Sequence, residues 1–217
     1  MEENTEKDPI VNKGASFEQI GPSESERRKW LIACGATGGV AAVAAGIPFA
    51  VSMAPSEKAK SAGAPVEVDI SNIPPGGVKT VEWRGNPVWI VRRTPEMLES
   101  LDGLDNKLAD PDSVRKEYPT PAYAKNTHRS IKPEIFVTVG ICSHLGCSPV
   151  SKFEKGAGSD MGNDWPGGFL CPCHGSTFDI AGRVYANKPA PDNLEVPRHM
   201  YLTDSKIVIG RDENGEA

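Results

Sequence analysis

The chain has 217 residues, of which 24% are charged and 38% hydrophobic, and its formal net charge is −5. This length accommodates one domain of ordinary size with appendages, and the composition excludes both a polytopic membrane protein and a wholly disordered chain. The sequence contains no basic run long enough to follow a phosphate backbone, so it argues against a nucleic-acid binder.

The N-terminal part predicts an export signal followed by a membrane anchor. Residues 1–30 form a polar tail that ends near a twin-arginine pair, Arg27 and Arg28, and such a pair ahead of an apolar stretch is typical of a receptor-read export signal (Tat signal). The next charged residue comes only after Met53, and a helix of about 34 Å over this stretch would cross a hydrocarbon core of ~30 Å. We therefore predict a transmembrane anchor helix over residues 31–54.

The charges that flank this stretch predict its orientation. Basic residues are more numerous just before it (Lys13, Arg27, Arg28 and Lys29) than just after it (Lys58 and Lys60). The positive-inside rule then places the N-terminus in the cytoplasm and the body in the periplasm, as in a single-pass protein of the cell inner membrane. The alternative is a cleaved signal peptide, because the small residues Ala62-Gly63-Ala64 suit a peptidase. The uncharged stretch is longer than a usual signal core, which favours a retained anchor.

A linker and a β-rich body follow. Residues 55–65 are dominated by Ala, Ser, Gly, Lys and Glu without apolar periodicity, which predicts a flexible hinge linker. The globular body, residues 66–217, contains a predicted hairpin over Gly85-Asn86 and a short helix capped by Thr94. The predicted strands cover residues 66–70, 78–83, 87–92, 135–139, 169–170, 199–203 and 206–209.

Two short motifs carry four of the five cysteines. Residues 142–147 read Cys-Ser-His-Leu-Gly-Cys, and residues 171–176 read Cys-Pro-Cys-His-Gly-Ser. Two thiolates and two imidazoles can close a tetrahedral metal site, or each like pair can hold one iron of a binuclear cluster. Either site leaves two of the six candidate ligands over, and in an exported protein a spare cysteine pair is most simply a disulfide.

The paired motif resembles the Rieske [2Fe–2S] family in the disulfide-bearing form of cytochrome bc complexes. The resemblance extends to residues 81–90, to Pro189-Ala190-Pro191, to the twin-arginine anchor and to the linker. It points to the iron–sulfur subunits of proteobacterial ubiquinol–cytochrome c reductase (cytochrome bc1 complex). The fold it implies is mainly β, a Rieske-type antiparallel β-sandwich head with a cluster-binding subdomain inserted at about residues 141–181.

The resemblance also implies a role for each residue of the two motifs. The implied ligands of the [2Fe–2S] cluster are Cys142 and Cys171 on one iron and His144 and His174 on the other. Cys147 and Cys173 would form a disulfide between the loops, and the Ser176 hydroxyl would donate to a bridging sulfide. Both histidines would act in catalysis, with His174 as the main quinone contact.

The activity that the resemblance implies is that of a respiratory complex III subunit, a redox translocase. Such a subunit accepts one electron, coupled to a proton, from ubiquinol at cytochrome b and passes the electron to cytochrome c1 within a dimeric complex, which supports proton translocation. Two positions depart from the family. Phe178 stands where the family often has Tyr, which predicts a lower potential, and Asn187-Lys188 replaces a Gly-rich start of the Pro loop (188–191) that covers the cluster.

Two other functions fit parts of the sequence. One is the Rieske subunit of a different exported oxidoreductase, similar to arsenite oxidase, with its signal cleaved. The other is a structural zinc domain, against which the extra cysteine pair argues. Outside the motifs we expect His128 and His199 to be structural or exposed, Trp83 and Trp89 to pack in the core, and residues 151–168 to form a surface excursion.

Overall fold

The computed structural model describes residues 23–56, 63–115 and 117–215. The chain divides into two compact units, residues 1–55 and residues 56–217. Much of the predicted tail (1–30) and the middle of the predicted linker (55–65) lie outside the described residues.

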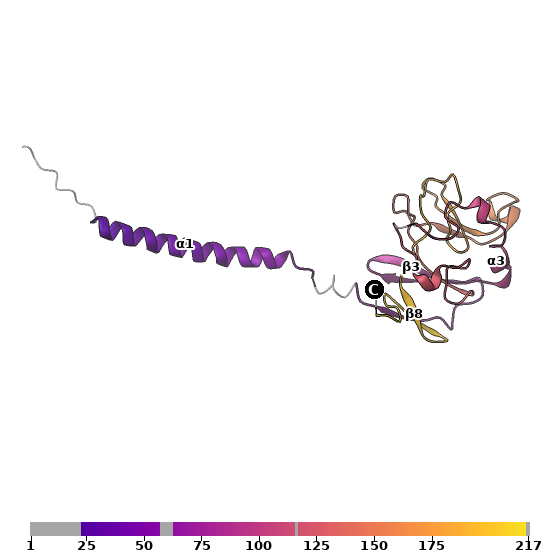
Figure 1. The fold of residues 1–217 in the computed structure, drawn as a ribbon, viewed down its shortest axis with the longest axis horizontal. Coiled ribbons are helices and arrows are strands. Elements are labelled where there is room, and N and C mark those ends of the chain that lie inside the picture. Colours follow the sequence, from indigo (N-terminus) through magenta and orange to yellow (C-terminus); the bar gives the residue numbers. More distant parts are fainter. Residues whose placement is uncertain (1–22, 57–62, 116, 216–217) are drawn as a thin grey trace, which may run out of the picture. The chain divides into compact units, whose positions relative to one another are not determined.

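The first unit contains one long helix, α1 (Glu24–Ser52), shown in indigo in Figure 1. A capping box starts it: the Ser23 hydroxyl accepts from the Glu26 N–H at 3.4 Å, and the Glu26 carboxylate accepts from the Ser23 N–H at 3.3 Å. The helix therefore begins before the predicted anchor span and includes Arg27 and Arg28. Its 29 residues include an 18-residue window with a mean hydropathy of 1.7, so it is long and apolar enough to cross a membrane.

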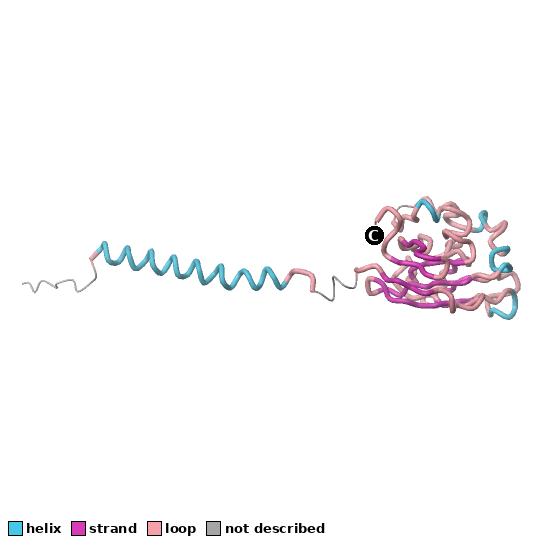
Figure 2. Tube along the Cα trace, turned by 90° about the horizontal axis from the view of Figure 1, so that it is seen from below, coloured by secondary structure: helices cyan, strands magenta, loops and turns pink. Residues whose placement is uncertain are grey.

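The second unit is built from three antiparallel sheets of three strands each, ordered β1-β9-β8, β2-β3-β4 and β5-β6-β7 (Figures 1 and 2). The strands are β1 (Val66–Asp69), β2 (Val78–Trp83), β3 (Asn86–Arg92), β4 (Ile135–Val139), β5 (Val150–Lys152), β6 (Gly168–Leu170), β7 (Thr177–Asp179), β8 (His199–Thr203) and β9 (Lys206–Ile209). The helices of this unit are α3 (Pro95–Glu99) and the 3₁₀ turns η1 (Asp105–Lys107), η2 (Ala122–Ala124) and η3 (Gly156–Ser159). The predicted mainly β class is confirmed.

In the sheet β2-β3-β4, strands β3 and β4 are packed on both faces, which explains why every residue of β4 is buried, whereas β2 is largely exposed. On one face, Ile90 and Val137 pack against Ile207 and Ile209 of β9 in a core that joins this sheet to β1-β9-β8. On the other face, Trp89, Val91 and Phe136 belong to a second core. Its remaining members include Phe169 of β6, Phe178 of β7 and the two cysteines Cys142 and Cys171. The second core therefore supports the cysteine-bearing loops.

Local sequence signals predict the turn between β2 and β3, with an error of one residue, and the cap of α3. The hairpin between β2 and β3 turns at Arg84-Gly85, whose φ angles are +52° and +75°, while Asn86 pairs with Trp83 inside the ladder. The predicted turn at Gly85-Asn86 is thus wrong by one residue, because a two-residue turn of this type needs a left-handed conformation at both central positions. The predicted cap of α3 is confirmed, since the Thr94 hydroxyl accepts from the Met97 N–H at 3.3 Å.

The predicted surface excursion over residues 151–168 is wrong in part. Its first residues belong to β5, which pairs with β6. Near its end, Trp165 is buried and its indole N–H donates to the Lys152 carbonyl at 2.8 Å. This hydrogen bond folds the segment back onto its own sheet.

Candidate metal centre

The first cysteine motif forms a closed loop between β4 and β5. The Cys142 N–H donates to the Cys147 carbonyl at 2.8 Å, and the Gly146 N–H donates to the Cys142 carbonyl at 3.1 Å. Gly146 has φ +79°, a left-handed conformation that glycine adopts without steric cost. The loop therefore presents its side chains from a fixed backbone.

The second motif, between β6 and β7, repeats this backbone pattern. The Cys171 N–H donates to the Ser176 carbonyl at 2.7 Å, the Gly175 N–H donates to the Cys171 carbonyl at 3.0 Å, and Gly175 has φ +75°. In both loops the cysteine at the first position is buried and the glycine at the fifth position makes the turn. The two motifs thus share a conformation although their histidines stand at different positions.

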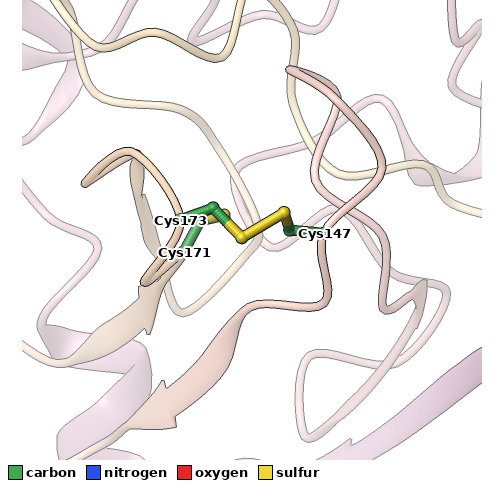
Figure 3. A group of neighbouring side chains, drawn as sticks. All are labelled: Cys147, Cys171 and Cys173. Atoms are coloured by element: carbon green, nitrogen blue, oxygen red, sulfur yellow. A yellow bond between two sulfur atoms is a disulfide. The ribbon is translucent and has the colours of Figure 1, made fainter.

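A disulfide joins the two loops at their outer ends. It links Cys147 of the first loop to Cys173 of the second, with a Cα–Cα distance of 6.7 Å, and Figure 3 shows it bridging the two loops with Cys171 beside it. The predicted pairing of Cys147 with Cys173 is confirmed. The sulfur atoms of Cys147, Cys171 and Cys173 lie within 4.8 Å of one another, but only Cys171 keeps a thiol, so these three cannot act as a three-thiolate site.

Two thiols and two imidazoles face each other across the loops. Cys142 and Cys171 are each 2% exposed and belong to the same core. The rings of His144 and His174 are perpendicular, with centroids 4.8 Å apart. His144 is half-buried and His174 exposed. This donor set, with two sulfurs on the buried side and two ring nitrogens on the outer side, fits a Rieske-type [2Fe–2S] cluster.

The Cys142 and Cys171 thiols lie in buried surroundings that suit a metal-bound thiolate better than a free one. Burial raises the pKa of the Cys142 thiol, and the neighbouring Cys171 sulfur adds to this, while the His144 N–H and, least of all, the Ser176 hydroxyl lower it. A metal ion deprotonates a coordinating thiol and supplies the compensating charge. The burial that disfavours a free thiolate therefore favours a metal-bound one.

Ser176 connects the second loop to the Pro loop. Its buried hydroxyl accepts from the Ala190 N–H at 2.9 Å. Ala190 packs in the same core as Cys142 and Cys171. Asn187, where the family has a Gly-rich start, has φ +59°, and Asn is one of the few other residues that tolerates this conformation. The departure from the family pattern is thus compatible with a Pro loop that closes on the thiols.

Ser143 is a contact of this site that sequence reasoning missed. Its hydroxyl donates to the Asp192 carbonyl at 2.6 Å and lies 3.2 Å from the Asp192 N–H. This pair ties the first loop to the segment that follows the Pro loop. The sequence carries no signal for it, because a serine inside a loop has many local partners available.

The remaining candidates are structural. His199 is buried, its Nδ1 lies 2.8 Å from the Pro197 carbonyl, and burial lowers its pKa, so the ring is neutral at pH 7. The carbonyl of half-buried His128 accepts from Arg93 at 2.8 Å. Trp83 and Trp89 are buried, one in each core. The expectations for these four residues are confirmed.

Comparison with known proteins gives a consistent picture. The sequence profile of the Rieske [2Fe-2S] domain matches residues 65–209. The ubiquinol-cytochrome c reductase iron-sulfur subunit of Allochromatium vinosum is 53% identical over 192 residues, which cover 88% of this chain and 91% of the relative. The subunit of the same name from Bradyrhizobium diazoefficiens is 39% identical, covering 85% of this chain and 94% of the relative. The mitochondrial Rieske subunit of the cytochrome b-c1 complex from Solanum tuberosum is 36% identical, covering 93% and 69%.

Proposed function

This chain belongs to the Rieske [2Fe–2S] family, and from that premise we propose that it is the iron–sulfur subunit of a quinol–cytochrome c oxidoreductase, respiratory complex III. In this role it takes one electron and a proton from ubiquinol and delivers the electron to cytochrome c1. The observation that carries the proposal is the convergence of two buried thiols and two outward imidazoles on a pair of disulfide-linked loops.

The ligand assignment follows from this arrangement. Cys142 and Cys171 would hold one iron, and His144 and His174 would hold the other. When bound, the cluster supplies one-electron redox chemistry at a potential of roughly −150 to +300 mV, because two neutral imidazoles replace two thiolates. We assign to the Ser176 hydroxyl a hydrogen bond donated to a bridging sulfide of the cluster, which would support this potential.

The outward side chains suit contact with a quinol. His174 is exposed, so the ring nitrogen that is free of metal can accept a hydrogen bond from a quinol hydroxyl and take its proton. Leu145, beside His144, is 71% exposed and gives an apolar surface to the outer end of the two cysteine loops, which we call the tip of the head. Such a surface excludes water when the tip docks against an apolar quinol site. His174 and His144 thus bind and deprotonate the substrate at one face.

The N-terminal unit supplies the anchor. Arg27 and Arg28 lie near the start of a helix that can span a membrane, directly ahead of its uncharged stretch, which supports a twin-arginine export signal with a cytoplasmic N-terminus and a periplasmic head. The partners of such an anchored head are cytochrome b, which holds the quinol site, and cytochrome c1, within a dimeric complex. The linker over residues 55–65 lets one tip visit both partners.

Stiffening the linker is expected to slow turnover. Replacing residues 56–64 with proline residues favours an extended, semi-rigid segment and restricts the head to fewer positions. Quinol–cytochrome c turnover should fall while the visible and EPR spectra of the cluster stay as in the wild type. A Gly/Ser segment of equal length is the matched control and should sustain turnover. Equal turnover in both variants would contradict the shuttle.

Adding a hydroxyl beside the thiols is expected to raise the midpoint potential. Phe178 is fully buried in the core that contains Cys142 and Cys171 and offers no hydrogen-bond donor. In Phe178→Tyr a phenol can donate to a ligand sulfur, which stabilises the reduced cluster. Redox titration measures the change. Phe153→Tyr, at the edge of the same core, is the control and should leave the midpoint where it is. No rise in Phe178→Tyr would refute the role assigned to this position.

An EPR experiment on membranes tests the proposed function. The low-temperature spectrum of the reduced membrane fraction should contain a Rieske-type signal, and a quinone-site inhibitor that contacts the exposed His174 should change its line shape. An EPR signal whose line shape no such inhibitor changes would argue against quinol as the substrate and favour a different oxidoreductase.

A further inference from the structure

Arg129 lies fully buried behind the second cysteine loop, with 1% of its surface exposed. Its guanidinium donates to the carbonyls of Ala181 at 3.0 Å, Gly182 at 3.3 Å and Leu194 at 2.8 Å. It also donates to the Thr120 hydroxyl at 3.1 Å. One side chain thus binds three separate segments of the head.

Burying an arginine side chain at this position costs free energy. All four acceptors are neutral oxygens, and the buried Nε has no hydrogen-bond partner. Burial lowers the pKa of the guanidinium to about 10, so it is still charged at pH 7. The backbone has φ +48°, a conformation that residues other than glycine rarely adopt. A buried cation with no carboxylate among its hydrogen-bond acceptors is costly and points to a specific role.

Arg183 and Arg93, the other buried arginines, have different surroundings. Arg183 is paired with the buried Asp179 carboxylate at 2.7 Å and with Asp105 at 3.0 Å. Arg93 donates mainly within the 128–133 segment, to Pro133, His128 and Ser130 at 2.7–2.8 Å. Arg129 alone among these three has short hydrogen bonds to both segments that lead to the metal centre.

The two segments that Arg129 binds meet again at the candidate ligands. Residues 181–182 follow β7, which begins directly after Ser176, and Leu194 follows the Pro loop. At the other end, the Ser176 hydroxyl accepts from the Ala190 N–H at 2.9 Å, and Ala190 packs in the same core as Cys142 and Cys171. The Leu194 N–H also donates to the Gly182 carbonyl at 2.8 Å, next to the guanidinium. The hydrogen bonds of Arg129 therefore hold the two segments together at one end, and the Ser176–Ala190 contact holds them together at the other.

We propose that Arg129 is a positioning residue of the metal centre: its planar guanidinium sets the spacing between the second cysteine loop and the Pro loop, and so maintains the Ser176–Ala190 contact beside the buried Cys142 and Cys171. The inference rests on the proposed ligand set. It assigns a role in cluster retention and potential to a residue that touches no ligand. Lysine cannot take this role, because its ammonium group lacks the planar set of N–H donors with which the guanidinium reaches carbonyls on two segments.

The test uses the full-length chain in detergent with its cluster bound. In Arg129→Lys the charge is kept and the planar set of donors is lost. The rate at which a chelator bleaches the visible absorption should rise roughly tenfold or more, the range typical of residues that orient metal ligands. The midpoint potential should fall, since the Ser176 hydroxyl that the family resemblance assigns to a bridging sulfide would shift with the Pro loop.

A variant that destabilises the head away from the metal centre serves as the control, because it separates a positioning role from a simple loss of stability. Ile207→Ala creates a cavity in the other core, between β9 and the sheet β2-β3-β4. It should lower thermal stability with little change in bleaching rate or midpoint. If Arg129→Lys bleaches no faster than Ile207→Ala, or keeps the wild-type midpoint, the positioning role is overturned.

A second variant covers the case in which Arg129→Lys does not fold. Thr120→Val keeps the side-chain shape and removes one acceptor of the guanidinium. It should increase the bleaching rate in the same direction but less, and an unchanged rate would overturn the proposal. A wild-type chain that holds no iron–sulfur cluster would instead refute the proposed function, so the two failures are distinct.

Discussion

Cys171→Ser is expected to yield a folded chain without an iron–sulfur cluster. Cys171 is buried at the base of the second loop, in the same core as Cys142. A serine hydroxyl is a harder and far less acidic ligand than a thiol, and iron–sulfur clusters are held by thiolates. The purified variant should lack both iron and the visible absorption of the wild type, and quinol–cytochrome c activity should be lost with them.

Cys34→Ser is the matched control for this change. Cys34 is the remaining free cysteine among the described residues, and it lies exposed on α1. The same chemical substitution there should leave iron content, spectrum and activity at wild-type values. A Cys171→Ser chain that retained its full iron content would show that the ligand assignment is wrong.

Removal of the disulfide is expected to produce the second large effect. The Cys147–Cys173 bond closes a stretch with a sequence separation of 26. By loop-closure entropy, a bridge of this span stabilises the folded state by about 3–4 kcal/mol. The double variant Cys147→Ser/Cys173→Ser should therefore lose that free energy of unfolding, as measured by chemical denaturation. It should also release its cluster faster, because the two loops are then held together only by their ligands.

Both cysteines must be replaced together for this experiment. A single replacement would leave a free thiol within 4.8 Å of the Cys171 sulfur, where a new disulfide could form and confuse the result. Cys34→Ser again serves as the control and should be as stable as the wild type. A double variant with the stability of the wild type would mean that the bridge contributes little beyond the metal centre.

Sequence patterns anticipated the parts of the fold that local chemistry determines. The strands β4, β8 and β9 have the predicted bounds, because β-branched or alternating residues end at clear turn signals. The two cysteine motifs were recognisable because thiol, imidazole and glycine stand at fixed spacings within six residues. The disulfide pairing came from the family resemblance and could not have come from spacing alone.

The features that the sequence did not reveal depend on contacts between distant segments. The order of strands within the sheets, such as β1 beside β9, is set by packing across the core. The fold of residues 151–168 depends on the Trp165 indole reaching Lys152. Arg129 looks like any loop arginine in the sequence, and only its bonds to Ala181 and Leu194 distinguish it.

The central claim is that two cysteines and two histidines on these loops hold a diiron cluster, and metal and sulfide analysis of freshly isolated full-length chain tests it most directly. We expect close to two irons and two acid-labile sulfides per chain, with zinc absent. One zinc ion per chain with no sulfide, or neither metal nor sulfide, would contradict it.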